Sequence, residues 1–355
     1  MEQVLQQFKE HIFAATARKT ALRICGGGSK DWYGQTRPGV ILDTRAYRGI
    51  IAYDPTELVI TARCGTPLAE IEAALAECKQ MLAFEPPRFG PGSTIGGVVA
   101  AGLSGPRRAT AGAVRDFVLG AALMNGTGDV LHFGGQVMKN VAGYDVSRLL
   151  AGSMGMLGLI LEVSLKVLPQ PVAETSLRFT MSAGEAIRRL NEWGGQPLPL
   201  SASVWRDGEL TVRLSGAQAA LEAAHRRMGG VEVPQARQFW DALRDQDDAF
   251  FQAGDALWRL SVPDATAPIA LPGRQVIEWG GAQRWIRTDA DAAAVRAEAA
   301  AGGGHATLFR GGDKSVGVFH PLAPAIEKIH RNLKLSFDPA GIFNPGCMYK
   351  ALQEP

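Results

Sequence analysis

Three consecutive glycines, Gly26 to Gly28, follow directly on the apolar residues 22–24, and the polar pair Ser29 and Lys30 comes next. Glycine loses more backbone entropy on folding than any other residue, so three in a row at the end of a buried strand carry a cost. A ligand that needs bare backbone amides offsets such a cost. The stretch therefore predicts a strand that ends in an anion-binding turn.

Two further glycine-dense segments, residues 90–106 and 152–158, also lie beside apolar, strand-like sequence. Neither familiar nucleotide fingerprint applies to CGGGSK, because it opens no helix, as a Rossmann motif must, and its lysine follows the serine, unlike that of a P-loop. Each segment alone could be a tight turn. Together they favour a pyrophosphate bound by consecutive N–H groups, a hydroxyl and an ammonium. The residues that would approach this anion from the opposite side are Ser93, Thr94, Gly96 and Gly97.

Composition and charge exclude several classes of function. The 355 residues are enough for two domains, and 46% hydrophobic with 20% charged residues is typical of a globular protein. A net charge of +2 gives no reason to expect nucleic acid as a partner. Because no apolar run could cross a membrane and the N-terminus lacks the apolar centre of a signal peptide, we expect a cytoplasmic protein. Four cysteines without a CxxC pair predict no metal site.

Strands and helices alternate irregularly, unlike the regular pattern of a doubly wound fold. We predict helices at residues 2–19, 66–81, 183–193, 217–228, 289–301 and 324–335, with Thr66 as the N-cap of the second. Strands are predicted at 21–24, 40–44, 49–54, 57–65, 175–181, 258–263, 276–287 and 305–310, and hairpins at 118–135 and 201–216. Beyond residues 169–171 this order suggests an α+β sandwich of ferredoxin-like type, without a visible internal repeat.

Several of these motifs, in a fixed order, resemble those of a flavoprotein family. The segments are RICGGGSK, PGSTIGGVVAAGLSGPRR, VRDFVLGAALMNGTGDVLHFGGQVMKNVAGYD, LLAGSMGMLGLILEVSLKVLP and FDPAGIFNPG. They are similar to the FAD-binding domain of the vanillyl-alcohol oxidase / p-cresol methylhydroxylase family. KNVAGYD, HATLFR and the FNPG ending further resemble the smaller FAD-binding subunits of bacterial glycolate oxidase (glycolate dehydrogenase). The likeness covers residues 23–169 and the C-terminal tail.

The resemblance implies an α+β fold in which two subdomains hold an extended FAD and a ferredoxin-like α+β cap domain covers the flavin. The expected domains are residues 1–171 for FAD binding, 172–314 for the cap, and 315–355 for a tail that returns to the FAD domain. The implied FAD-binding residues are Gly26, Gly27, Gly28, Ser29, Lys30, Ser93, Thr94, Ile95, Gly96, Gly97, Gly155, Gly158, Ile160 and Asn344.

The catalytic residues stay unknown at this point. Oxidation of a 2-hydroxy acid needs a cation for the carboxylate and a base for the hydroxyl proton. His305 and Arg310 are candidates, but their odd separation predicts opposite faces of one strand. His320 is predicted to lie in a turn and His330 on a helix face. Core packing is predicted for Trp258, Trp279 and Trp285. Arg107 and Arg108 are predicted to lie in a solvated loop. Lys139 and Tyr144 are either polar contacts of the cofactor or part of a helix start capped by Asp145.

The resemblance also implies partners. Larger subunits of such enzymes carry an H-x-GDGN-x-H metal motif in the cap, whereas this chain has GGDKS and a lone His305. We therefore expect the FAD-binding subunit of a glycolate dehydrogenase complex, which oxidises glycolate to glyoxylate. Its partners would be a larger FAD-containing catalytic subunit and an iron–sulfur subunit, with peripheral contact to the inner membrane through the complex. The alternatives are a self-sufficient FAD-dependent 2-hydroxy-acid dehydrogenase and a non-catalytic assembly subunit.

Overall fold

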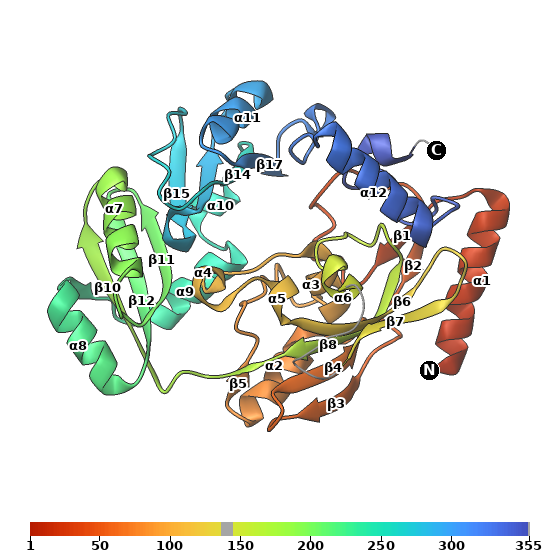
Figure 1. Ribbon diagram of the computed structural model, residues 1–355, viewed down its shortest axis with the longest axis horizontal. Coiled ribbons are helices and arrows are strands. Elements are labelled where there is room, and N and C mark those ends of the chain that lie inside the picture. Colours follow the sequence, from red (N-terminus) through yellow and green to blue (C-terminus); the bar gives the residue numbers. More distant parts are fainter. Residues whose placement is uncertain (136–144, 354–355) are drawn as a thin grey trace. The chain divides into compact units, whose positions relative to one another are not determined.

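The computed structural model describes residues 1–135 and 145–353, and the chain forms two compact units (Figure 1). The first unit contains Met1–Leu103, Ala113–Pro169 and Pro321–Pro355, and the second contains Ser104–Gly112 and Gln170–His320. The sequence suggests domain limits after residues 171 and 314. In the structure the chain passes from one unit to the other after Pro169 and again after His320. The short segment Ser104–Gly112 lies inside the expected FAD-binding domain but belongs to the second unit.

The first unit combines two small sheets, one five-stranded sheet and mostly short helices. Its helices are α1 (Glu2–Arg18), α2 (Leu68–Glu77), α3 (Ile95–Ala101), α5 (Val114–Phe117), α6 (Val146–Leu149), α12 (Pro324–Phe337) and the 3-10 turn η3 (Lys350–Gln353). Its strands are β1 (Leu22–Cys25), β2 (Val40–Asp43), β3 (Ile50–Asp54), β4 (Val59–Arg63), β5 (Gln80–Met81), β6 (Val118–Met124), β7 (Val130–Gly134), β8 (Leu159–Lys166) and β9 (Leu168–Pro169). Over residues 1–135 and 145–353, no helix has the length and apolar character that crossing a membrane requires.

The five-stranded sheet is antiparallel, with the order β3-β4-β8-β6-β7. Its central strand β8 buries residues on both faces, as a strand covered from two sides must. The predicted hairpin is confirmed by β6 and β7. Asn125 fixes its turn, because the side-chain oxygen of Asn125 accepts hydrogen bonds from the backbone N–H groups of Thr127 and Asp129 at 3.0 and 2.8 Å.

Helix α2 begins one residue later than the sequence predicts. The prediction of Thr66 as its N-cap is wrong, since Pro67 occupies that position and the first helical residue is Leu68. The Thr66 hydroxyl instead donates to the Arg63 carbonyl at 2.7 Å and accepts from the Gly49 N–H at 2.8 Å. A hydroxyl beside a turn can form hydrogen bonds either with the helix or with the neighbouring loops, and the Thr66 hydroxyl bonds backbone groups outside the helix.

Helix α3 lies in the second glycine-dense segment, where the sequence predicts no helix. Gly96 and Gly97 are poor helix formers, which explains the omission. The helix forms because Ile95, Val98 and Val99 are all buried on one side of it. Its first turn is also held from outside, since the N–H groups of Ile95 and Gly96 donate to the carbonyls of Thr66 and Cys64, both at 2.9 Å. Tertiary contacts thus outweigh local propensity.

The C-terminal tail extends the parallel pair β1 and β2. Phe343 forms a parallel bridge with Leu22, the Leu22 N–H donates to Ile342, and the Asn344 N–H donates back to the Leu22 carbonyl at 2.9 Å. A buried ion pair fixes the turn before it, because the Lys334 ammonium donates to the Asp338 carboxylate at 2.5 Å. The tail therefore reaches the start of the first glycine segment from 320 residues away.

The second unit is an eight-stranded antiparallel sheet with helices. Its strands are β10 (Ala173–Thr180), β11 (Leu200–Arg206), β12 (Glu209–Gly216), β13 (Val231–Glu232), β14 (Leu257–Ser261), β15 (Arg274–Glu278), β16 (Gln283–Arg287) and β17 (His305–Arg310). Its helices are α4 (Arg108–Ala111), α7 (Ala183–Gly194), α8 (Gln218–Met228), α9 (Ala236–Asp245), α10 (Ala249–Gln252), η1 (Trp279–Gly281), α11 (Ala292–Ala301) and η2 (Lys314–Val316). Of these helices, α4, α9, α10, η1 and η2 were not predicted, and η1 separates β15 from β16 within the predicted strand 276–287.

The order of this sheet reveals a repeat that the sequence does not show. The order β13-β10-β12-β11 with α7 and α8 is that of a ferredoxin-like unit. The order β15-β16-β14-β17 with α11 repeats it, except that residues 262–273 form a loop where the first helix would stand. The two halves join edge to edge, because β11 pairs antiparallel with β15. The repeat is therefore one of strand order, which the sequence does not make visible.

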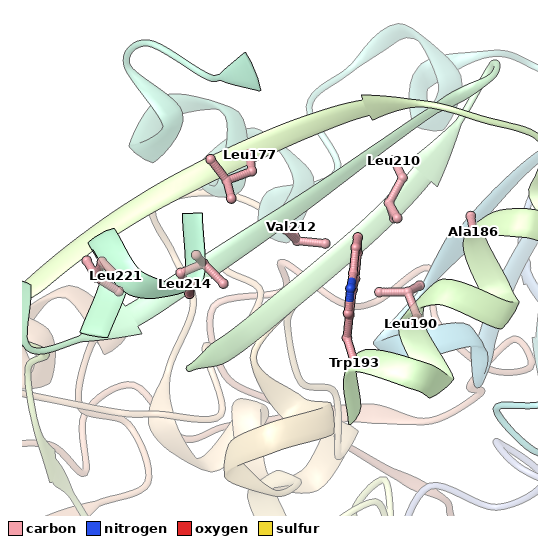
Figure 2. Packing of buried hydrophobic residues seen from close by; sticks show 9 residues of the cluster. Leu177, Ala186, Leu190, Trp193, Leu210, Val212, Leu214 and Leu221 are labelled. Atoms are coloured by element: carbon pink, nitrogen blue, oxygen red, sulfur yellow. The ribbon is translucent and has the colours of Figure 1, made fainter. Parts of the chain in front are cut away.

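The core of the first half is built from alternate residues of β12 and one face of α7 (Figure 2). Leu210, Val212 and Leu214 are fully buried on the same side of β12. Leu190 and Trp193 of α7 pack in the same cluster. Burial of each large apolar side chain contributes about 1.5–3 kcal/mol, so this cluster suffices to hold helix and sheet together.

Candidate functional site

The three glycine-dense segments converge on one pocket in the first unit, with a volume of about 730 Å³ including its open side. Every residue that the sequence places at the cofactor lines it, with the exception of Ile95, whose side chain is buried beneath α3. The further lining residues are Ile24, Asp31, Tyr33, Arg37, Thr44, Cys64, Ala100, Ala101, Met154 and Leu159. Residues separated by up to 320 positions thus share one surface.

Two of the segments meet backbone to backbone, which only glycine permits. A Cβ added to Gly27 would lie 1.4 Å from the carbonyl oxygen of Gly92. A Cβ on the neighbouring Gly26 would lie 2.4 Å from the Thr94 hydroxyl. The first two glycines are therefore required by the approach of residues 92–94, and together the two loops make one wall of the pocket.

Lys30 is a cation of the pocket that bridges the same two loops. Its ammonium donates to the Ser93 hydroxyl at 2.9 Å, to the Ser29 hydroxyl at 3.3 Å and to the Arg88 carbonyl at 3.4 Å. It also lies 5.6 Å from the centre of the Phe89 ring. Two hydroxyls and a fixed positive charge therefore face the pocket side by side, an arrangement suited to phosphate oxygens.

Backbone amides beside Lys30 are available to an anion. Within residues 1–135 and 145–353, the N–H groups of Gly27, Gly28 and Ser29 have no protein acceptor. Backbone donors that go without a protein partner are rare away from solvent, and successive ones at a turn form a concavity for an anion. The turn thus holds donors for a negatively charged group and a neighbouring ammonium that matches its charge.

Arg37 and Asp31 are pocket residues that sequence reasoning missed. Asp31 pairs with Arg23 and, at 3.4 Å, with Arg37, whose guanidinium also donates to the Lys30 carbonyl. These contacts set the shape of the loop after the glycines. The signal in the sequence is weak, since Arg37 stands alone in QTRPG and nothing there indicates that the chain turns back toward residue 30.

Asn344 connects three segments at the other end of the pocket. Its side-chain oxygen accepts from the Ile24 N–H at 2.8 Å, and its amide donates to the Met154 carbonyl at 2.7 Å. A Cβ on Gly155 would lie 2.7 Å from this amide nitrogen, so a side chain at residue 155 would displace it. The backbone of Asn344 has a φ of 38°, which asparagine tolerates better than most residues.

Helix α3 presents only small residues to the pocket. Gly97, Ala100 and Ala101 recur at helical spacing on its pocket face, while its apolar side chains are buried behind. A Cβ on Gly97 would meet only the Thr94 hydroxyl, at 3.3 Å. A flat, elongated ligand can therefore lie directly against this helix.

The candidate catalytic pair has structural partners in the second unit. Arg310 donates to the side chain of Gln246 at 3.1 Å and to the Phe251 carbonyl at 3.4 Å. A register shift between β14 and β17 interrupts the strict alternation from which opposite faces were predicted. Burial, with Arg259 and His320 nearby, lowers the pKa of His305. His320 accepts from the Ala306 N–H of β17 at 3.5 Å.

The tryptophans and the arginine pair also have structural roles. Trp258 and Trp285 are buried, as predicted for core residues, and half-buried Trp279 donates to the Gly105 carbonyl at 3.0 Å. The prediction of a solvated loop at residues 107 and 108 is wrong. Arg107 is 7% exposed and pairs with Glu174 at 2.5 Å, and Arg108 lies 4.4 Å from the centre of the Trp279 ring.

The KNVAGYD motif is only partly described. Lys139 and Tyr144 lie outside the described residues. Asp145 is described and caps α6, since its carboxylate accepts from the Arg148 N–H at 3.4 Å. That contact confirms the helix-start role predicted for this residue.

The cysteines are separate thiols. All four are free, and no group of three His, Cys, Asp or Glu residues suited to a metal exists among residues 1–135 and 145–353. Burial raises the pKa of Cys64 and of Cys347 to about 12, so both stay protonated at neutral pH. Burial and the Asp31 carboxylate also raise the pKa of Cys25, which makes it a weak nucleophile.

Taken as a donor set, the pocket fits the diphosphate bridge of an extended dinucleotide. It has exposed amides, two hydroxyls and one ammonium at one end, and a small-residue helix face with apolar Ile24, Leu159 and Ile160 along its length. The amides, hydroxyls and ammonium suit charged phosphate oxygens, and the small-residue helix face with its apolar neighbours suits a flat ring system buried away from water.

Comparison with known proteins identifies the family. Residues 5–134 match the family of FAD binding domains. The chain is 49% identical over 347 residues to glycolate oxidase subunit GlcE of Escherichia coli, and the match covers 98% of both chains. It is 30% identical over 177 residues to glycolate oxidase subunit GlcD of Bacillus subtilis, covering 50% of this chain and 36% of that relative. A D-lactate dehydrogenase of Anaerostipes hadrus is 34% identical over 139 residues, or 39% of this chain and 29% of the enzyme.

Solved structures support the fold. An alkyldihydroxyacetonephosphate synthase matches with a TM-score of 0.63 and 16% identity, over 95% of this chain and 73% of that one. This likeness, with the matched FAD binding domain, confirms the predicted fold class and FAD as the predicted cofactor. The chain therefore belongs to the family of the glycolate oxidase subunit GlcE, among the FAD-binding oxidoreductases.

Proposed function

We propose that this chain is the FAD-binding subunit of a glycolate oxidase complex that converts glycolate to glyoxylate. The observation that carries the proposal is the 49% identity to GlcE across 98% of both chains. The pocket supports it, because three distant glycine segments supply the amides, hydroxyls and ammonium that a dinucleotide diphosphate needs. When bound, FAD would supply the acceptor for the two electrons of this oxidation, and an iron–sulfur partner would receive them from this subunit.

The chain's own residues would bind and orient the cofactor. In this proposal Lys30, with the amides of Gly27 and Gly28, holds the diphosphate. Asn344 keeps β1 and residues 154–155 at a fixed separation along the rest of the pocket. The small face of α3 lets the cofactor lie close enough to exclude water.

The partners in this proposal are a larger FAD-containing catalytic subunit and an iron–sulfur subunit. GlcD of Bacillus subtilis shares with this chain a segment that is only 36% of its own length. That supports a common FAD-binding part within subunits that otherwise differ. The scattered cysteines support placing the iron–sulfur step in another chain. A cytoplasmic location, with peripheral membrane contact through the complex, belongs to the same proposal.

The absorbance of the flavin tests the function directly. The chain purified alone is expected to be yellow and to keep its colour when glycolate is added, whereas the complex with its partner subunits bleaches. Acetate, which lacks the hydroxyl, serves as the matched control. Bleaching of the isolated chain by glycolate would favour a self-sufficient dehydrogenase, and a colourless chain that takes up no FAD would leave only an assembly role.

A substitution at Gly97 tests the pocket, because a Cβ there would meet only the Thr94 hydroxyl, at 3.3 Å. Gly97→Leu is expected to reduce bound FAD at least about ten-fold, because the new side chain enters the space between α3 and the first glycine loop. The fold itself should gain about 0.5–1 kcal/mol from replacing a helical glycine. Flavin content per chain, measured by absorbance after desalting, gives the result.

The matched control for this variant is Gly194→Leu. Gly194 also lies in a helix, α7, and a side chain there would meet nothing within 4 Å. Its flavin content is expected to equal that of the wild type. A folded Gly97→Leu protein with unchanged flavin would show that the cofactor does not lie against α3.

A further inference from the structure

The segment Ser104–Gly112 links the pocket helix to the second unit. Ala101 lines the pocket as the last residue of α3, and only Gly102 and Leu103 separate it from Ser104. The chain is anchored in the second unit until Gly112 and then returns to the first unit at Ala113. We call Ser104–Gly112 the tether.

Arg107 is the main anchor of the tether within the second unit. Its guanidinium donates to Glu174 at 2.5 Å and to the Ser215 hydroxyl at 3.3 Å. The same Ser215 hydroxyl donates to Glu174, also at 2.5 Å. A buried guanidinium is costly unless it is paired and hydrogen-bonded, so these contacts hold Arg107 in place firmly.

Other contacts reinforce the anchor on both sides of Arg107. The Thr110 hydroxyl donates to the Ser201 carbonyl at 3.0 Å. The Trp279 indole donates to the Gly105 carbonyl at 3.0 Å, and the Arg108 guanidinium stacks on the same ring at 4.4 Å. Burial acts to raise the pKa of Glu174, but the Ser215 hydroxyl, Arg213 and Arg107 together lower it, so the carboxylate stays charged.

Helix α3 has only seven residues and cannot hold its position by itself. Its start is fixed in the first unit by hydrogen bonds from Ile95 and Gly96, and Gly152 and Met154 donate to the carbonyls of Val99 and Ala100 near its end. Beyond that end, the chain is fixed through Arg107. Helix α3 is thus held at both ends within the first unit, and the chain that follows its last residue is anchored within the second unit.

We propose that Arg107 is a positioning residue for FAD retention, acting through the tether on the pocket face of α3. Release of the Arg107–Glu174 pair lets the end of α3 move and so speeds dissociation of the cofactor. The inference rests on the proposed FAD binding in this pocket and adds a second-unit control over it. No residue of the tether is required to contact the cofactor.

The test compares two arginines of one network. Arg107→Met removes the charge from the tether. Arg213→Met removes a positive charge from β12. Arg213 also lies 4.0 Å from Glu174 but is outside the tether. Both guanidinium groups are equally buried, with 8% and 6% of the side chain exposed. The pair of variants thus separates loss of the anchor from loss of a buried charge.

The rate of FAD release from the full chain, followed as the fluorescence rise after dilution, is the measurement. Arg107→Met is expected to release FAD at least about ten-fold faster, the effect of losing a hydrogen bond to a charged group. Arg213→Met should stay within about two-fold of the wild type. In Arg107→Met combined with Glu174→Gln, the second change should add nothing, because the two residues act as one pair.

Equal release rates in the wild type and Arg107→Met, or equal acceleration by both arginine variants, would overturn the inference. Neither result would affect FAD binding itself, which fails separately if the wild-type chain holds no flavin. Should Arg107→Met not fold, Thr110→Val removes a weaker anchor of the same tether, and faster release by it is expected. An unchanged rate in that variant would contradict the inference.

Discussion

Replacing Asp338 with asparagine is expected to lower the free energy of unfolding by about 3–5 kcal/mol, because it leaves a buried ammonium without its counter-charge. Asp338 is 0% exposed, and Lys334 is 5% exposed. Lys334 further donates to the carbonyls of Met156 and Phe343, each at 2.8 Å. The Asp338 carboxylate in turn accepts from the N–H groups of Ile342 and Phe343. Three donors thus converge on one carboxylate.

The loss should extend to the pocket, because the tail that Asp338 holds carries Asn344. Asn344 joins β1 to the loop at residue 154. Flavin content is therefore expected to fall together with stability. Urea unfolding followed by circular dichroism, with flavin absorbance measured on the same samples, gives both quantities.

The control lies in the same helix. Glu327 pairs with Arg331 at 3.0 Å across one turn of α12, and both side chains are about one-third exposed. Glu327→Gln is expected to cost less than about 1 kcal/mol, as for other solvent-exposed pairs. If Asp338→Asn lowered the free energy of unfolding no more than Glu327→Gln, the Lys334–Asp338 ion pair would not be what holds the C-terminal tail in place.

Replacing Gly27 with alanine is expected to weaken FAD binding by about 5- to 150-fold, which corresponds to about 1–3 kcal/mol of overpacking. The single added methyl would lie 1.4 Å from the Gly92 carbonyl oxygen and 2.3 Å from its carbon. Neither loop can yield without moving its amides or the hydroxyl of Ser93. The loss of affinity would thus arise from a clash between the two loops, which displaces the groups that line the pocket.

Flavin titration of the stripped protein measures this effect. Gly194→Ala is the control, since a methyl at this helical position meets nothing within 4 Å and should leave FAD affinity unchanged. Wild-type affinity in Gly27→Ala would mean that the loops at residues 27 and 92 are not in contact when the cofactor is bound.

The local pattern of the sequence predicted much of what can be decided locally. The apolar spacing of α1 and α7 and the Asn-Gly turn between β6 and β7 indicated these elements, because side-chain periodicity and turn chemistry act over a few residues. Helix α3 was missed for the same reason. Its glycines argue against a helix, and only burial of Ile95, Val98 and Val99 in the folded chain favours one.

The candidate site shows the same division. Glycine clusters, a serine and a lysine were sufficient to indicate an anion-binding pocket, since bare amides and a fixed cation are properties of the residues themselves. Arg37 and Asp31 were missed, because their place depends on how the loop after β1 folds back. Arg107 was misassigned to a solvated loop, because its partner Glu174 is 67 residues away.

The sequence by itself determined the class of ligand and the family, because the donor-rich turns and their order along the chain are encoded locally. Only the tertiary structure decided that Gly27 faces Gly92, that Asn344 closes the pocket from the far end of the chain, and that Ser104–Gly112 belongs to the second unit. It alone also showed the repeated strand order of the eight-stranded sheet. The physical reason is that packing and pairing between distant segments arise from the shape of the whole folded chain, which short-range propensities do not contain.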